Sequence, residues 1–144
     1  MLSVWYNIGN KNQNFFNRKM SHFSTIKTKL KSKTKLVEAL QLLQYDVTED
    51  VMLENPLDHE HKQWKVDVAV GDDIGFRLNK EGVYELVSDI QTWKLPVPPK
   101  RFLEKVTQSY AKVSVVDAVQ QQGFTVVTES KSVDNTIEIV AEKW

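Results

Sequence analysis

The chain has no cysteine, so its three histidines are the first residues to examine for chemistry. His59 and His61 stand two residues apart in the stretch DHEH, with Asp58 and Glu60 as oxygen donors between and beside them. On an extended segment both imidazoles would lie on one side, as some metal sites require. Two histidines without a third placed ligand fall short of a usual zinc set. They are therefore weak metal candidates in a polar loop, and we expect neither a metal nor a cofactor.

His22 precedes Phe23 at the start of a patterned segment, where an imidazole could carry a proton near neutral pH. A single histidine at the edge of a core is more often a hydrogen-bonded structural residue. The sequence offers no recognisable set of nucleophile, base and orienting group, and its five glycines form no phosphate-binding pattern. We expect no enzyme activity, and a cryptic enzyme centred on His22 ranks last among the functions considered.

A row of lysines is the third chemical feature. These are Lys27, Lys29, Lys31, Lys33 and Lys35. Residues 1–35 hold eight basic and no acidic side chains, whereas residues 36–144 hold eleven basic and nineteen acidic ones. Alternate lysines on a strand share one face and could line phosphates, but no aromatic platform is interleaved with them. We expect a solvated basic face, with nucleic-acid or anionic-surface binding through these lysines and His22 as the alternative.

Hydrophobic spacing predicts the elements that position these residues. Ile26, Thr28 and Leu30 alternate with lysines, which indicates a strand with one solvated face. Thr34 can cap a helix that ends near Gln44. Further strands are expected over 45–53, 64–70, 74–78 and 83–90, with a terminal hairpin over 124–130 and 135–144. Two more helices are expected over 100–114 and 115–122, the second ending at Gly123.

This order of elements predicts an α+β fold, with a single antiparallel sheet of about five to six strands and two to three helices packed on it. In the segment 64–70, Trp64, Val66, Val68 and Val70 should share one face. One core is expected between sheet and helices. Its members are Leu36, Leu40, Trp64, Val66, Val68, Ile74, Phe76, Leu78, Phe102, Val106, Val119, Ile137 and Ile139.

The length of 144 residues, with 41% hydrophobic side chains, suits one domain. Residues 1–19 are rich in asparagine and lack hydrophobic periodicity, so we expect a poorly ordered extension followed by a single domain over 20–144. An import signal is disfavoured, because this extension has little serine or arginine. No apolar run is long enough to span a membrane as a helix, and we expect a soluble protein.

Five short motifs together resemble one known family. They are MSHFSTIKT from Met20, DIGF at 73–76, TQSYA at 107–111, GF at 123–124 and the terminal Trp144. The sequence is similar to the hypothetical chloroplast reading frame thirty-five family, a domain of unknown function encoded in algal plastids and cyanobacteria. The resemblance implies a plastid location, with the stroma expected, and a start at Met20; it implies no activity. Asn135 departs from the glycine that the family tends to have there.

Three functions remain open from the sequence. The first is a non-catalytic accessory or protein-interaction domain, with an unknown protein as partner. The second is a nucleic-acid or anionic-surface binder that uses the segment 27–35. The third is the cryptic enzyme around His22.

Overall fold

The computed structural model describes residues 2–8, 23–54, 63–134 and 136–143. Five strands form one antiparallel sheet in the order β2-β6-β5-β4-β3: β2 (Ser24–Lys27), β6 (Tyr84–Ser88), β5 (Ile74–Leu78), β4 (Gln63–Val70) and β3 (Val47–Glu54). Three strands form a second antiparallel sheet in the order β1-β8-β7: β1 (Leu2–Ile8), β8 (Ile137–Lys143) and β7 (Thr125–Lys131). The helices are α1 (Lys33–Leu42), the short η1 (Ile90–Thr92) and α2 (Pro99–Gln121).

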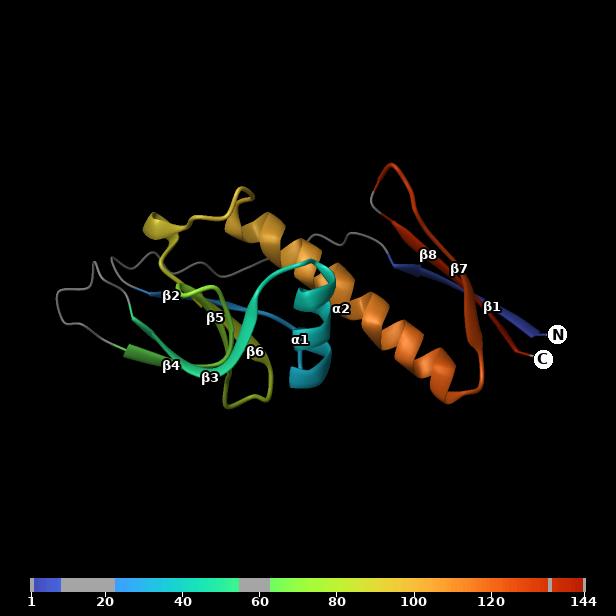
Figure 1. Ribbon diagram of the computed structural model, residues 1–144, viewed down its shortest axis with the longest axis horizontal. Coiled ribbons are helices and arrows are strands. Elements are labelled where there is room, and N and C mark those ends of the chain that lie inside the picture. Colours follow the sequence, from blue (N-terminus) through green and yellow to red (C-terminus); the bar gives the residue numbers. More distant parts are fainter. Residues whose placement is uncertain (1, 9–22, 55–62, 135, 144) are drawn as a thin grey trace.

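The α+β class and an antiparallel sheet of five strands are confirmed. The terminal hairpin also forms, but it belongs to the second sheet and not to a sixth position in the first. Figure 1 shows α2 running from the five-stranded sheet to the three-stranded one, so that this helix joins two regions of the molecule. We call them the large region (β2 to β6, α1 and the first half of α2) and the small region (β1, β7, β8 and the second half of α2).

The first strand corrects one expectation. The expected poorly ordered extension spans residues 1–19, yet within it Leu2–Ile8 pairs antiparallel with β8 along its whole length. The short run LSVWYNI contains apolar residues but no clear period, and its pairing partner lies at the other end of the chain. Such a non-local pairing leaves no local signal in the sequence. Residues 9–22, which include Met20, lie outside the described residues.

Helix α2 is also longer than expected, because the two segments 100–114 and 115–122 form one helix of 23 residues. Pro99 occupies its first turn, where a missing N–H costs nothing. At the expected break, the Ser114 hydroxyl donates to the Tyr110 carbonyl oxygen at 2.9 Å, so the serine is satisfied inside the helix. Gly123 has φ of 87° just after the helix, which confirms the expected left-handed end.

The N-cap of helix α1 lies two residues before the expected cap at Thr34. Ser32 is the N-cap, and its hydroxyl accepts from the Lys35 N–H at 3.3 Å. The Tyr110 hydroxyl of α2 accepts from the Ser32 N–H at 2.9 Å, which fixes this end of α1 against α2. Ser109 strengthens the same junction, since its hydroxyl donates to the Ala39 carbonyl oxygen at 2.9 Å.

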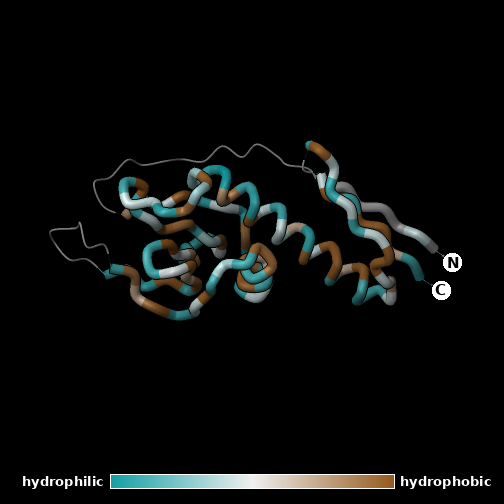
Figure 2. The backbone as a smooth tube through the Cα atoms, turned by 45° about the horizontal axis from the view of Figure 1, so that its top comes forward, coloured by the Kyte–Doolittle hydropathy of each residue, from teal (hydrophilic) through white to brown (hydrophobic). Residues whose placement is uncertain are grey.

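The main core lies between the five-stranded sheet and the two helices. Phe102 of α2 is fully buried at its centre, with ring centroids 5.4 Å from Tyr45, 5.5 Å from Trp93 and 6.2 Å from Phe76. Figure 2 shows hydrophobic stretches along the strands of this sheet, and a tube of α2 that alternates between hydrophilic and hydrophobic residues. This alternation is that of a helix with one buried face.

The opposite face of the sheet is buried too, because the β3–β4 hairpin bends. Its ladder lacks the Asp50–Asp67 pair, and Asp50 has φ of 53°. Beyond this point Leu53 and Val66 lie against Gly75 of β5, where an added Cβ would meet their methyl groups at 2.8 and 2.6 Å. The far half of the hairpin thus folds across β5, and glycine is required beneath it.

This bend corrects the predicted face of β4. Trp64 and Val66 pack with a second cluster of buried residues on the far face, whereas Val68 and Val70 belong to the main core. The residue between them, Asp67, accepts from the Leu78 N–H at 2.8 Å and so replaces a ladder bond. The strict alternation of the strand is broken at this position.

The expectation of one core is therefore wrong. Ile137 and Ile139 form a third cluster with partly buried residues of α2 and β7, separate from the main core. Leu78 is 46% exposed, because it lies at the end of β5, and it joins none of the three clusters. Val119 is buried as expected, but it also lies outside the three clusters.

Candidate functional site

The segment 27–31 confirms the predicted alternation of its side chains. Ile26, Thr28 and Leu30 are buried, whereas Lys27, Lys29 and Lys31 are exposed. The pairing with β6 continues past the end of β2, since the Tyr84 N–H donates to the Leu30 carbonyl oxygen at 2.8 Å. Three of the five lysines therefore lie along one solvated edge of the large region. Lys33 and Lys35 belong to the first turn of α1 instead.

Two of these lysines have acidic partners. Lys27 pairs with Glu81 of the turn between β5 and β6. Lys33 lies 3.1 Å from an oxygen of Asp50 and 3.4 Å from one of Glu49, next to the bend of β3. The hydrogen bond to Asp50 raises the pKa of Lys33. Exposed pairs of this kind contribute little to stability, but they reduce the positive field that a polyanion would meet.

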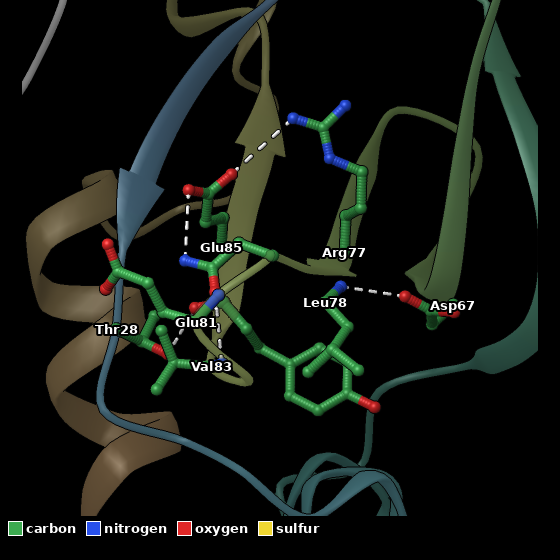
Figure 3. A network of polar contacts seen from close by, with 9 residues as sticks. Thr28, Asp67, Arg77, Leu78, Glu81, Val83 and Glu85 are labelled. Atoms are coloured by element: carbon green, nitrogen blue, oxygen red, sulfur yellow. Dashed lines mark hydrogen bonds and ion pairs between the residues drawn. The ribbon is translucent and has the colours of Figure 1, made fainter.

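A polar network holds the β5–β6 turn (Figure 3), and Glu81 of this turn pairs with Lys27. The side-chain oxygen of Asn79 accepts hydrogen bonds from the N–H groups of Glu81 and Val83, at 2.9 and 3.2 Å. Its amide donates to Glu85 at 3.3 Å, and Glu85 also pairs with Arg77 at 3.5 Å. These contacts join residues of the turn and its two strands to one another, which is typical of a structural arrangement of the turn.

The structure leaves the histidine hypotheses untested. His22, His59 and His61 all lie outside the described residues. Within the described parts of the chain, no three histidine or acidic side chains come together in a way that could hold a metal ion. The weak metal site at His59 and His61, and the binding or proton-carrying role of His22, therefore stay predictions.

A groove of about 370 Å³ lies where the two regions meet, and sequence reasoning missed it. It is lined by Leu42 and Leu43 of α1, by Lys105, Gln108, Ser109 and Lys112 of α2, and by residues 129–131 and Ile137 of the β7–β8 hairpin. Lys105 and Lys112 are seven residues apart, so they share one face of α2. That spacing was the one signal that the sequence carried. The hairpin side of the groove could not be found, since it depends on how β7 packs beside α2.

The groove combines positive charge with apolar surface. Lys112 pairs with Glu129 across it. Among the described residues, Lys105 and Lys131 have no acidic partner. Leu42 is 53% exposed at the rim. Burial of a leucine side chain is favourable in free energy, so contact with a ligand here would be stabilising. The arrangement suits a ligand that has both acidic and apolar groups.

The edge of the small sheet adjoins this groove. Among the described strands, β7 pairs with β8 alone, and its residues 127–131 are all exposed. Val127 has no partner in the register with β8, which marks an irregularity between Val126 and Thr128. From Thr128 to Lys131 the pairing is regular. An exposed edge of this kind presents unpaired backbone groups next to the lysines of the groove.

These features define an α+β protein whose described surface carries a mixed basic and apolar groove beside an open sheet edge. A family model described as "Protein of unknown function (DUF1257)" matches residues 39–140. The chain belongs to this family. No solved structure matches it.

Relatives extend the match over more of the chain. It is 31% identical over 134 residues to the "Uncharacterized protein ycf35" of Pyropia yezoensis, and 33% identical over 135 residues to that of Guillardia theta. Each alignment covers 87% of this chain and 98% of the relative. The resemblance inferred from the short motifs is confirmed. The ycf genes are plastid-encoded, which supports a plastid origin for this chain.

No described helix has both the length and the apolar character needed to cross a membrane.

Proposed function

We propose that the chain is a non-catalytic protein-interaction domain that acts in the plastid stroma. The observation that carries this proposal is the groove between α1, α2 and β7, with its exposed Leu42 and with Lys105 and Lys131, which have no acidic partner among the described residues. Interaction sites combine apolar contacts with charges that select the partner. In this groove the lysines would supply the charge and Leu42 an apolar contact.

Affinity purification from the native cells tests this proposal. The chain carries a small tag, complexes are cross-linked, and co-purified proteins are quantified by mass spectrometry. We expect one or a few enriched proteins with the natural chain. The double variant Lys105→Glu, Lys131→Glu should lose them, because it reverses the charges of these two groove lysines.

A matched control reverses two exposed lysines far along the sheet from the groove. Lys65 lies on β4 and Lys80 in the β5–β6 turn, and both are exposed. The Lys65→Glu, Lys80→Glu variant should retain the same proteins. A natural chain that enriches no protein contradicts the proposed function, and equal loss in both variants would reduce the effect to one of net charge.

Nucleic-acid binding through the lysine row is the second candidate. The exposure of Lys27, Lys29 and Lys31 along one edge favours it, because three cations then share one side. The pairing of Lys27 and Lys33 with acidic side chains opposes it. We therefore expect only weak binding of RNA at about 0.15 M salt, which is the physiological screening range.

A titration of labelled RNA by fluorescence anisotropy separates the two candidates. The triple variant Lys27→Ala, Lys29→Ala, Lys31→Ala should leave protein partners unchanged and alter the free energy of unfolding by no more than about 0.5 kcal/mol. Tight RNA binding that this variant abolishes, with a salt dependence that falls by nearly one unit of slope per lysine, would promote the nucleic-acid function. Loss of the co-purified proteins after ribonuclease treatment would point the same way.

A further inference from the structure

The sheet edges with described side chains differ in how open they are to another strand. β2 is only four residues long, and the exposed lysines of the segment 27–31 follow it. β3 is interrupted at Asp50, which has a positive φ and is paired with Lys33. Short strands, lysines and bends are the usual protection of an edge against further pairing. Both edges of the large region are protected in this way.

β7 differs from these two edges in its second half. The irregularity near Val127 disturbs the first half of the strand, but Thr128–Lys131 pairs regularly with residues 137–140 of β8. All four residues of this second half are exposed. Its outer backbone groups are in the extended geometry that another strand needs for hydrogen bonding.

The regular half of β7 is also the half that borders the groove. Glu129, Ser130 and Lys131 line it from the strand side, opposite Lys105 and Lys112 of α2. Of the four charges there, Lys112 and Glu129 neutralise each other, and Lys105 and Lys131 remain as an excess of two positive charges. A segment placed along this half would meet cations, with Leu42 and Ile137 as apolar contacts.

We propose, on the basis of the proposed interaction function, that an extended acidic segment of a partner protein adds to β7 as a fourth strand of the small sheet. Backbone hydrogen bonds to Thr128–Lys131 would supply affinity irrespective of sequence. Acidic side chains on the groove-facing side of the added strand pair with Lys105 and Lys131. Because side chains alternate along a strand, every second residue of the segment is acidic and faces the groove, and the residues between them face away from it.

A second copy of the chain is the competing occupant of this edge. Pairing of β7 with β7 would bring two copies of the same cationic groove together and oppose Lys105 and Lys131 with identical charges. Like charges at an interface suppress association. The excess of positive charge therefore favours an acidic partner over self-association.

Synthetic peptides test the inference on the full chain. The probe is a fluorescein-labelled peptide of seven residues in which glutamate alternates with valine, and its Kd is measured by fluorescence anisotropy at about 0.15 M salt. One control peptide has lysine in place of glutamate. Another is methylated at every backbone nitrogen, so that it keeps the side chains but has no N–H to donate. We expect binding of the acidic peptide alone.

The variant Lys105→Glu, Lys131→Glu should weaken this binding by at least about tenfold and accept the lysine peptide instead, because the charge preference is reversed. The variant Lys65→Glu, Lys80→Glu should behave as the natural chain. Hydrogen–deuterium exchange provides a readout that is independent of affinity. The acidic peptide should slow exchange in residues 125–131 and leave exchange in the β4–β6 strands unchanged.

Several results would overturn the inference. Equal binding of the N-methylated peptide would mean electrostatic attraction without strand addition. A dimer in solution that dissociates when Lys131 is changed would mean that a second copy occupies the edge. No binding of the acidic peptide, with protein partners still lost from the groove variant in native cells, would reject strand addition and leave the proposed function standing. Absence of any protein partner would reject the proposed function itself.

Discussion

The large region buries both faces of its sheet, whereas the small region buries β8 and leaves most of β7 exposed. In the large region, helices cover one face and the bent β3–β4 hairpin covers the other. In the small region, the cluster of buried Ile137 and Ile139 is packed against by partly buried residues of α2 and β7. Buried apolar area is the main source of folding free energy, so the large region holds most of the stability.

This difference indicates where an interaction site can lie without destabilising the fold. A strand buried on both faces and both edges has no free group with which to bind a partner. β7 contributes little to any core, and so its exposed side chains and its edge can be selected for binding. α2 is common to both regions, because Phe102, Leu103 and Val106 enter the main core while Ala111, Val115 and Val116 contact the small one.

The largest expected effect tests whether the large region carries the fold. Phe76→Ala removes a fully buried ring at the centre of the main core. The free energy of unfolding should fall by about 3–5 kcal/mol, which is a large part of the stability of a typical domain. Urea denaturation followed by far-ultraviolet circular dichroism measures it. Both regions should unfold together, because α2 loses its packing; a small region that stays folded would show that the two are independent.

The converse variant perturbs the small region alone. Ile139 is fully buried on β8, and Ile139→Ala should cost about 2–5 kcal/mol in local stability. Hydrogen exchange should accelerate in residues 125–131 and 137–143 and stay unchanged in β4, β5 and β6. Val127→Ala, at a half-exposed position of β7, is the control. Equal acceleration in the five-stranded sheet would mean that the two regions form one cooperative unit.

A smaller effect tests the bent hairpin that covers the second face of the large sheet. Gly75→Ala places a methyl group where Val66 and Leu53 already lie, and overpacking of this kind costs about 1–3 kcal/mol. Combining it with Val66→Ala, which makes room, should give a double variant less destabilised than the sum of the two single ones. A Gly75→Ala variant as stable as the natural chain would mean that the hairpin does not press on β5.

The smallest effect concerns Asp73 in the turn before β5. Burial raises the pKa of its carboxyl group above the ordinary value of 3.8, and one carboxylate oxygen is buried without a hydrogen-bond partner among the described residues. An acid whose pKa is raised by folding lowers stability once it ionises, so stability falls as pH rises through the folded pKa. Asp73→Asn should therefore stabilise the chain slightly at neutral pH.

That gain should vanish below pH 3.8, where the carboxyl group is protonated in both the folded and the unfolded chain. Urea denaturation at neutral and at acid pH gives the two differences. The exposed Glu54→Gln at the end of β3 serves as the control and should show no such change. A larger gain at acid pH would contradict the assignment.

Local pattern predicted much of the large region. The alternation of lysines with Ile26, Thr28 and Leu30 is confirmed, since buried and exposed side chains alternate from Ile26 to Lys31. The side change within β4 could not be predicted, because it depends on Asp50, a residue on another strand that adopts a left-handed conformation. Strand period is a local property, and such a bend is decided by packing between strands.

The small region was harder to predict for the same reason. Its first strand pairs with the last, and the local sequence of neither strand indicates that pairing. The helix that joins the regions has no helix-breaking residue at Ser114 where it passes from one region to the other. The groove combines α1, α2 and β7 and exists only after both regions have folded. Of its members, only Lys105 and Lys112 had a spacing that could be read in advance.

The pairing of β1 with β8 has a mechanical consequence. Leu2 lies opposite Lys143, so the first and the last described strands leave the small sheet at the same end. A force that pulls the two ends apart loads the outermost pair of hydrogen bonds alone, and the pairs open one after another as in a zipper. β1 should therefore detach at low force while the five-stranded sheet bears no load. In a pulling experiment, the first step would be the release of this strand, and a substitution in the main core would not shift it.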